Sequence, residues 1–215
     1  MANYFNYFPK EYYFLNDNTS SVDVVTNITS KFKFEDDFKN NTVVYYEYEI
    51  QDGETPEIVA YKIYGSPEKH WIILSLNDIV NPQIDWPIEQ NSLKKLIDIK
   101  YQASEYANSS TTGAGTTWAD TNIHSYYKIE TQTNNLNNKK FIDKIQIDAN
   151  TYANVASSSE TYTLQNGYSI TLSISKETKT YLEYEIEQND NKRTIKILKE
   201  EFVDAVEDEF KRIIR

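Results

Sequence analysis

The chain has 215 residues, and 22 Lys and Arg against 33 Asp and Glu give it a formal net charge of −11 at pH 7. Nucleic acid and anionic bilayers repel such a surface, so we expect neither as a partner. The absence of Cys excludes disulfides and thiol chemistry. No apolar run reaches the roughly 20 residues of a membrane span, and the first residues do not resemble a signal peptide.

The first predicted element is an aromatic segment at residues 4–14, YFNYFPKEYYF, within a predicted N-terminal domain 1–42. Pro9 excludes a long continuous central strand. Aromatic anchors of this kind either dock on a partner protein or pack against their own domain. If they dock, the candidate interface residues are Tyr4, Phe5, Tyr7, Phe8, Tyr12, Tyr13 and Phe14.

Residues 22–38 fit two patterns. Their apolar side chains approximate helical spacing, whereas the β-branched residues Val24, Val25 and Ile28 favour a strand. We predict a helix that begins near Ser21 and ends in a turn at 39–42.

The predicted central domain, 43–101, opens with a strand at 43–50, which is rich in Val, Tyr and Ile. Gly53 permits the turn that follows, Thr55 is placed to cap a helix, and Gly65 is placed to end it. Ser66, Pro67 and Glu68 repeat the start signal for a second short helix.

The core of this domain is expected around two indole rings, those of Trp71 and Trp86. The second helix ends near Asn77, and Asn81-Pro82 marks another turn. Residues 88–101 predict a further helix, which Asn91-Ser92 could cap. Its apolar stripe comprises Leu93, Leu96, Ile97 and Tyr101.

The ordered residues of this central stretch resemble a known module. The pattern of strand, turn and paired helices is similar to LysM, and the longer set resembles the LysM-like baseplate wedge proteins of contractile-tailed, T-even-like phages. The residues that carry the resemblance are Gly53, Glu54, Thr55, Tyr64, Gly65, Trp71, Asn77, Pro82 and Trp86. The wedge family also opens with an aromatic-Pro-Tyr segment, which favours docking of residues 4–14 on a partner.

The chain departs from an ordinary LysM module after Pro87. A second strand should follow there, but residues 88–101 predict a helix. The departure counts against glycan binding, because the sugar groove depends on the loop that enters that strand.

Residues 102–180 are predicted to form a β-rich insertion. It begins with a low-complexity loop at 104–122, in which only Trp118 offers a large apolar side chain. Strands are predicted at 126–130, 141–147, 161–164 and 168–175, with Asn166-Gly167 as a strong hairpin signal between the last two.

The C-terminal domain, 181–215, is predicted as a hairpin and a helix. YLEYEIE at 181–187 alternates and would pair with residues 192–198. Residues 200–215 form an amphipathic helix whose acidic start and basic end complement its dipole. Its candidate interface residues are Phe202, Val206 and Phe210.

No constellation in the sequence predicts catalysis, so we expect neither an enzyme nor a bound metal or cofactor. His70 and His124 lie on different segments, and no His, Asp or Glu cluster has metal-ligand spacing. The predicted fold is α+β: a LysM-like strand-helix-helix core, flanking helices, a β-rich insertion and a C-terminal hairpin plus helix.

The resemblance implies a structural protein of the virion, made late, that joins neighbouring wedges of a contractile-tail baseplate. Its partners would be other wedge and hub proteins, with several copies in a symmetric assembly formed in the host cytoplasm. The alternative function is binding of peptidoglycan, an N-acetylated glycan, by the LysM-like unit.

Overall fold

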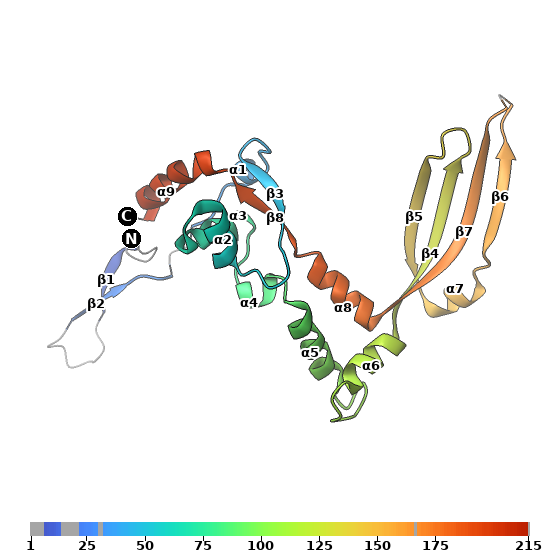
Figure 1. The fold of residues 1–215 in the computed structure, drawn as a ribbon, viewed down its shortest axis with the longest axis horizontal. Coiled ribbons are helices and arrows are strands. Elements are labelled where there is room, and N and C mark those ends of the chain that lie inside the picture. Colours follow the sequence, from blue (N-terminus) through green and yellow to red (C-terminus); the bar gives the residue numbers. More distant parts are fainter. Residues whose placement is uncertain (1–6, 14–21, 30–31, 166, 215) are drawn as a thin grey trace. The chain divides into compact units, whose positions relative to one another are not determined.

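The computed structural model describes residues 7–13, 22–29, 32–165 and 167–214, and it has an α+β fold (Figure 1). The chain divides into two compact units. Unit 1 combines residues 1–89 with residues 189–215, and unit 2 comprises residues 90–188. The long insertion therefore separates two parts of unit 1 along the sequence.

Unit 1 begins with an antiparallel hairpin in place of the predicted helix. Strand β1 (Lys10–Tyr13) pairs with β2 (Asp23–Thr26), so the prediction of a helix from Ser21 was wrong over β2. The branched side chains of Val24 and Val25 are restricted at χ1 and suit a strand, which is the alternative that the sequence left open. Helix α1 (Asp36–Lys39) follows as a single turn.

The predicted strand-helix-helix core is confirmed. Strand β3 (Tyr45–Glu49) leads to α2 (Pro56–Tyr64), where Thr55 Oγ1 accepts a hydrogen bond from Ile58 N at 3.4 Å. Gly65 ends α2 with φ 68°, a left-handed conformation that glycine adopts without strain. The second helical segment comprises the 3-10 turn η2 (Pro67–Lys69) and α3 (His70–Leu76), and α4 (Pro82–Asp85) follows.

The predicted hairpin of residues 181–187 and 192–198 was wrong, because the first of these segments is helix α8 (Tyr181–Asp190). A capping box starts α8: Thr180 N donates to Glu183 Oε2 at 2.8 Å, and Glu183 N donates to Thr180 Oγ1 at 3.2 Å. Strand β8 (Thr194–Leu198) instead pairs antiparallel with β3, from Tyr45 opposite Leu198 to Glu49 opposite Thr194.

Helix α9 (Glu200–Ile214) confirms the predicted amphipathic helix and closes the core of unit 1. Its apolar face packs with α2, α3 and β8 around residues that are almost fully buried. These include Val59, Ile72, Ile73, Leu76, Ile197, Leu198, Val203 and Phe210. Trp71 and Trp86 are buried in the same cluster, as predicted.

Unit 2 contains two helices where the sequence predicted one helix and a loop. Helix α5 (Gln90–Tyr101) was predicted, although it begins before Asn91-Ser92, while α6 (Ala114–Thr121) lies inside the predicted low-complexity loop. The Asp98 carboxylate on α5 accepts hydrogen bonds from Gly113 N at 2.8 Å and Thr116 N at 3.1 Å, so it caps α6 from another helix. Apolar burial comes from Trp118, whose ring lies against those of Tyr101, Tyr106 and Tyr181, at distances of 5.0 to 5.5 Å between ring centres.

The rest of unit 2 is the predicted β-rich insertion. Four antiparallel strands run in the order β5 (Lys140–Ile147), β4 (Ile123–Asn134), β7 (Ser169–Thr180) and β6 (Ser158–Thr163), with α7 (Ala149–Asn154) at one end (Figure 1). The register places Phe141, Ile145 and Leu172 on one face. Among the described residues of these strands only Ser125 is buried, so the sheet is largely exposed.

Candidate assembly surface

Of the described aromatic residues before residue 30, the two most exposed lie on the hairpin of β1 and β2, which we call the arm (residues 7–13 and 22–27). Tyr12 is 76% exposed and Tyr13 is 56% exposed. The arm is held by Asn27, whose backbone N donates to Pro9 O at 2.8 Å and whose Nδ2 donates to Glu11 Oε1 at 2.7 Å. A two-stranded hairpin is at best marginally stable in water, so this exposed arm suits a segment that is completed by a partner.

The base of the arm belongs to the core of unit 1. Phe8 is 5% exposed, and its ring packs edge-on against Phe210 with centroids 6.0 Å apart. Tyr7 meets the same ring at 6.3 Å. The predicted interface segment is therefore split, with Tyr7 and Phe8 as anchors and Tyr12 and Tyr13 facing outward. Tyr4, Phe5 and Phe14 lie outside the described residues.

The candidate interface residues of α9 face inward. Phe210 is 2% exposed, Val206 is 8% exposed, and Phe202 packs partly buried against the core. These side chains stabilise unit 1 and offer little area to a partner.

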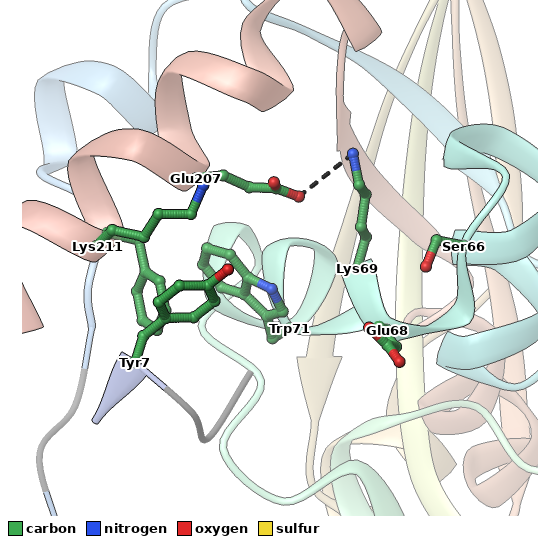
Figure 2. A pocket seen from close by; sticks show the side chains of 8 residues that line it. Tyr7, Ser66, Glu68, Lys69, Trp71, Glu207 and Lys211 are labelled. Atoms are coloured by element: carbon green, nitrogen blue, oxygen red, sulfur yellow. Dashed lines mark ion pairs between the residues drawn. The ribbon is translucent and has the colours of Figure 1, made fainter. Parts of the chain in front are cut away.

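A pocket of about 190 Å³ lies beside the base of the arm (Figure 2). Trp71 and Tyr7 supply aromatic walls, and an ion pair of 3.2 Å joins Lys69 to Glu207 at the opposite side. Lys211 Nζ lies 5.5 Å from the centre of the Tyr7 ring. This mixture of apolar and charged groups can receive a side chain of a partner, but no arrangement for bond-breaking chemistry is visible among these described residues.

Glu54 organises the loop that contains the Gly-Glu-Thr motif. Its buried carboxylate pairs with Lys62 and accepts hydrogen bonds from Gln51 N and from Tyr48 Oη, both at 2.9 Å. Burial alone would raise the pKa of Glu54, but the bonds from Lys62, Gln51 and Tyr48 together lower the pKa below its ordinary value. Burial, with the hydrogen bond to Glu54, raises the pKa of Tyr48 to about 12.

The remaining motif residues fasten β8 and the loops of unit 1. Tyr64 Oη donates to Leu198 O at 3.0 Å. Asn77 Oδ1 accepts from Lys196 N at 2.7 Å and Asn77 Nδ2 donates to Lys196 O at 2.8 Å, so this side chain bonds to the edge of β8 as a strand would. Pro82 starts α4, and Trp86 Nε1 donates to Glu54 O at 2.7 Å.

The sequence identified Asn77 and Tyr64 but missed their partner strand. Lys196 and Leu198 lie more than a hundred residues further along the chain, and no local pattern reports such a pairing. The capping box at Thr180 and Glu183 was a readable local signal, and it could have shown that residues 181–187 do not pair with β8.

The two histidines take structural positions. His70 Nδ1 lies 2.8 Å from Pro67 O, and the His124 ring stacks on Tyr184 with centroids 3.9 Å apart. Within the described ranges no three His, Cys, Asp or Glu side chains gather in a group that could hold a metal ion. None of the helices in the described part of the chain combines the length and apolarity needed to cross a membrane.

The sequence was compared with known families and with curated proteins. A family model described as base plate wedge protein 53 matches residues 3–213. No curated protein matches the chain.

Proposed function

Because this chain belongs to the base plate wedge protein 53 family, we propose that it joins neighbouring wedges while a phage baseplate assembles, and that the arm makes the contact. As a member of this family, the protein is a structural component of the baseplate, it is located in the tail of the virion, and it interacts with other baseplate components. The arm would contact other wedge proteins or hub proteins. Several copies of the chain would take part in a symmetric assembly, which would form in the host cytoplasm.

The observation that carries this proposal is the contrast in exposure between the two ends of the described N-terminal segment, residues 7–13. Phe8, at 5% exposure, attaches the arm to a rigid core, whereas Tyr12, at 76%, has most of its surface still to bury. Burial of apolar area contributes about 25 cal/mol per Å², so a partner that covers the arm would recover free energy that the isolated chain does not. The net charge of −11 keeps the free subunit soluble until then.

The test replaces Tyr12→Thr and Tyr13→Thr together. Threonine keeps the strand propensity of β1 and removes both rings. We expect an unchanged melting temperature of the subunit but loss of wedge joining, measured as complete baseplates by electron microscopy after complementation of a phage that lacks the gene. Tyr61→Thr is the matched control, because Tyr61 is 64% exposed on α2, away from the arm. Complete baseplates at the normal level with the doubly substituted arm would contradict the proposal.

For the alternative function, binding of peptidoglycan, the structure removes the objection that a second strand is missing, but it adds the objection that the indole rings are buried. Strand β8 supplies the second strand whose apparent absence counted against a sugar groove. However, Trp71 and Trp86 are 8% and 6% exposed, and the Trp86 indole N–H is already bonded to Glu54, so neither ring offers a face for stacking on a sugar. We expect no saturable binding to insoluble peptidoglycan in a pull-down, and saturable binding would favour the alternative.

A further inference from the structure

Six of the described strands, β1, β2, β3, β8, β5 and β6, each have one neighbouring strand and one open edge, and two of these edges, those of β5 and β3, complement one another. In the described residues β5 pairs with β4, and β3 pairs with β8, and neither has a partner on its other side. An open edge presents backbone N–H and C=O groups that can add a further strand. The chemistry of the two edges decides which strand each can accept.

The outward-facing backbone groups of β5 follow from one hydrogen bond. Asn134 N donates to Lys139 O at 2.9 Å, and because bonded and non-bonded pairs alternate in an antiparallel ladder, Phe141, Asp143 and Ile145 bond towards β4. The N–H and C=O groups of Ile142 and Lys144 therefore point away from the sheet. The edge is free of Pro and Gly, and Phe141, Ile142 and Ile145 are 69%, 60% and 41% exposed.

The same argument defines the edge of β3. Lys199 N donates to Val44 O and Ile50 N donates to Arg193 O, both at 2.9 Å, so the even-numbered residues bond towards β8. The backbone groups of Tyr45, Glu47 and Glu49 point outward, and an added strand would displace the exposed Gln51 side chain, whose Nε2 donates to Glu49 O at 3.0 Å. Tyr46 is 41% exposed on this strand.

The two edges have opposite charge. Strand β5 carries Lys140 and Lys144 against the single acidic residue Asp143, whereas β3, with the sequence YYEYE, carries only acidic charge. Residues 123–180 contain six Lys against five Asp and Glu, so the sheet is net +1 in a chain of −11. The acidic repulsion between copies is therefore weakest at the sheet.

Pairing of β5 with a second β5 is disfavoured. Because only the even-numbered residues of β5 have outward-facing backbone groups, two antiparallel copies of β5 can pair only in registers that place one residue opposite its own copy. The two registers with the most paired residues place Asp143 opposite Asp143 or Lys144 opposite Lys144. Like charges directly opposite in a sheet destabilise the pair. An acidic strand with an open edge is the better complement, and β3, with two Glu, carries more acidic charge than β2 or β6, which have one acidic residue each.

We propose that β5 of one copy pairs antiparallel with β3 of a second copy. One register brings the outward-facing groups of both strands together, with Glu47 opposite Lys144 and Tyr46 opposite Ile145. Glu49 then lies diagonal to Lys140, and Lys144 lies between Glu47 and Glu177, its 2.7 Å partner in its own chain. The contact is head-to-tail, because the two edges differ, so it can link several copies in series. It goes beyond the proposed function, since it requires no other baseplate protein.

The absence of Cys from the chain allows a direct test by disulfide formation. Chains carrying Tyr46→Cys are mixed with chains carrying Ile145→Cys under mild oxidation. These positions form a non-hydrogen-bonded pair in the proposed register, with Cα atoms about 4.5 Å apart, within the range of a disulfide. Ile142→Cys is the matched control, because Ile142 is more exposed but faces the other side of the sheet. We expect several times more linked heterodimer with Ile145→Cys than with Ile142→Cys.

Charge reversal tests the complementarity in the same assay. Lys144→Glu in the chain with Ile145→Cys should lower the yield several-fold, and Glu47→Lys in the other chain should restore it. Independently of any cysteine, hydrogen exchange at the amides of Ile142 and Lys144 should slow as the concentration of the natural chain rises.

Equal yields at Ile145 and Ile142, yields that ignore the charge reversals, or exchange that ignores concentration would overturn the pairing of β3 with β5. None of these results bears on the arm, which is measured by wedge joining. The failure of one proposal is thus distinguishable from the failure of the other.

Discussion

At the residue scale, aromatic side chains serve two purposes in this chain. Trp71 lies within 4.5 Å of Phe210 and 5.7 Å of Phe32, measured between ring centres, and it joins α3 to α9. Tyr12 and Tyr13 have the same kind of side chain but face outward on the arm. Residue type alone does not distinguish a core anchor from an interface residue, because an aromatic ring buries a large apolar area in either position.

Replacement of Trp71→Ala should lower the free energy of unfolding by about 3–5 kcal/mol, because it removes a buried ring and leaves a cavity between α3 and α9. Denaturant unfolding followed by circular dichroism measures the change. Tyr61→Ala, at a position 64% exposed, should change stability by no more than about 0.5 kcal/mol. A similar loss for both variants would show that Trp71 does not fill the core.

Glu54 predicts a pH dependence. Its pKa is lowered in the folded chain from the ordinary value of 4.5, so the unfolded state binds more protons as the medium becomes acidic. The stability due to Glu54 is complete above pH 4.5 and is lost as pH falls through the folded pKa. Glu54→Gln should therefore be less stable than the natural chain at pH 7, and the difference in melting temperature should shrink below pH 4.5. A difference that stays constant with pH would assign the effect of Glu54 to packing alone.

At the element scale, one small residue and one carboxylate allow helices α5 and α6 to approach closely, and the Trp118 ring also stacks on Tyr101. A Cβ on Gly115 would lie 2.0 Å from Asp98 O, so only glycine permits this approach. Asp98 in turn caps α6, and its hydrogen bonds, of which that from Gly113 N is the largest effect, lower the pKa of its carboxyl group. The polar stretch before Trp118 folds because these contacts come from α5.

Gly115→Ala should force α5 and α6 apart and lower the stability of unit 2 by about 1–3 kcal/mol, as overpacking of a close contact does. Fluorescence of Trp118 offers a local measurement, because its ring stacks on Tyr101 with centroids 5.5 Å apart. Asp120→Ala is the control on the exposed side of α6, and it should leave both readings nearly unchanged. An equal effect of the two substitutions would contradict the close helix contact.

At the scale of the whole molecule, unit 1 is built from both ends of the sequence. Strand β8 and helix α9 return after unit 2 to complete a sheet and a core that residues 43–89 begin. Asn189, which is 4% exposed, marks the return: its Oδ1 accepts from Ile88 N at 2.7 Å and its Nδ2 donates to Ile88 O at 3.0 Å. The two crossings between the units thus lie side by side in unit 1.

Excision of residues 90–188 should leave unit 1 folded. A short Gly-Ser linker from Glu89 to Asn189 has little distance to span, because Asn189 already bonds to Ile88. We expect cooperative thermal unfolding of this shortened chain. A chain that ends at residue 188 should not unfold cooperatively, because it lacks Ile197, Leu198 and Phe210 of the core. Cooperative unfolding of the chain truncated at 188 would show that β8 and α9 are dispensable.

The sequence by itself determined the local elements whose signals lie within a few residues. Thr55, Gly65 and the pattern of apolar residues specified α2, and the single Asn-Gly pair at 166–167 indicated the pairing of β6 with β7, because caps and turns act through neighbouring backbone groups. The ordered motif of residues 53–86 also indicated the baseplate wedge family, to which the chain belongs.

Tertiary structure alone decided the pairings. It placed β8 against β3 and formed α6 on Asp98, and it turned Phe210 and Val206 inward. Each of these outcomes depends on contacts between groups that are far apart in the sequence. Such a contact stabilises the fold only when both partners are in place, so neither segment shows it by itself. The predicted interface residues divide for the same reason: Phe8 and Phe210 are buried in the core of unit 1, whereas Tyr12 and Tyr13 on β1 are exposed.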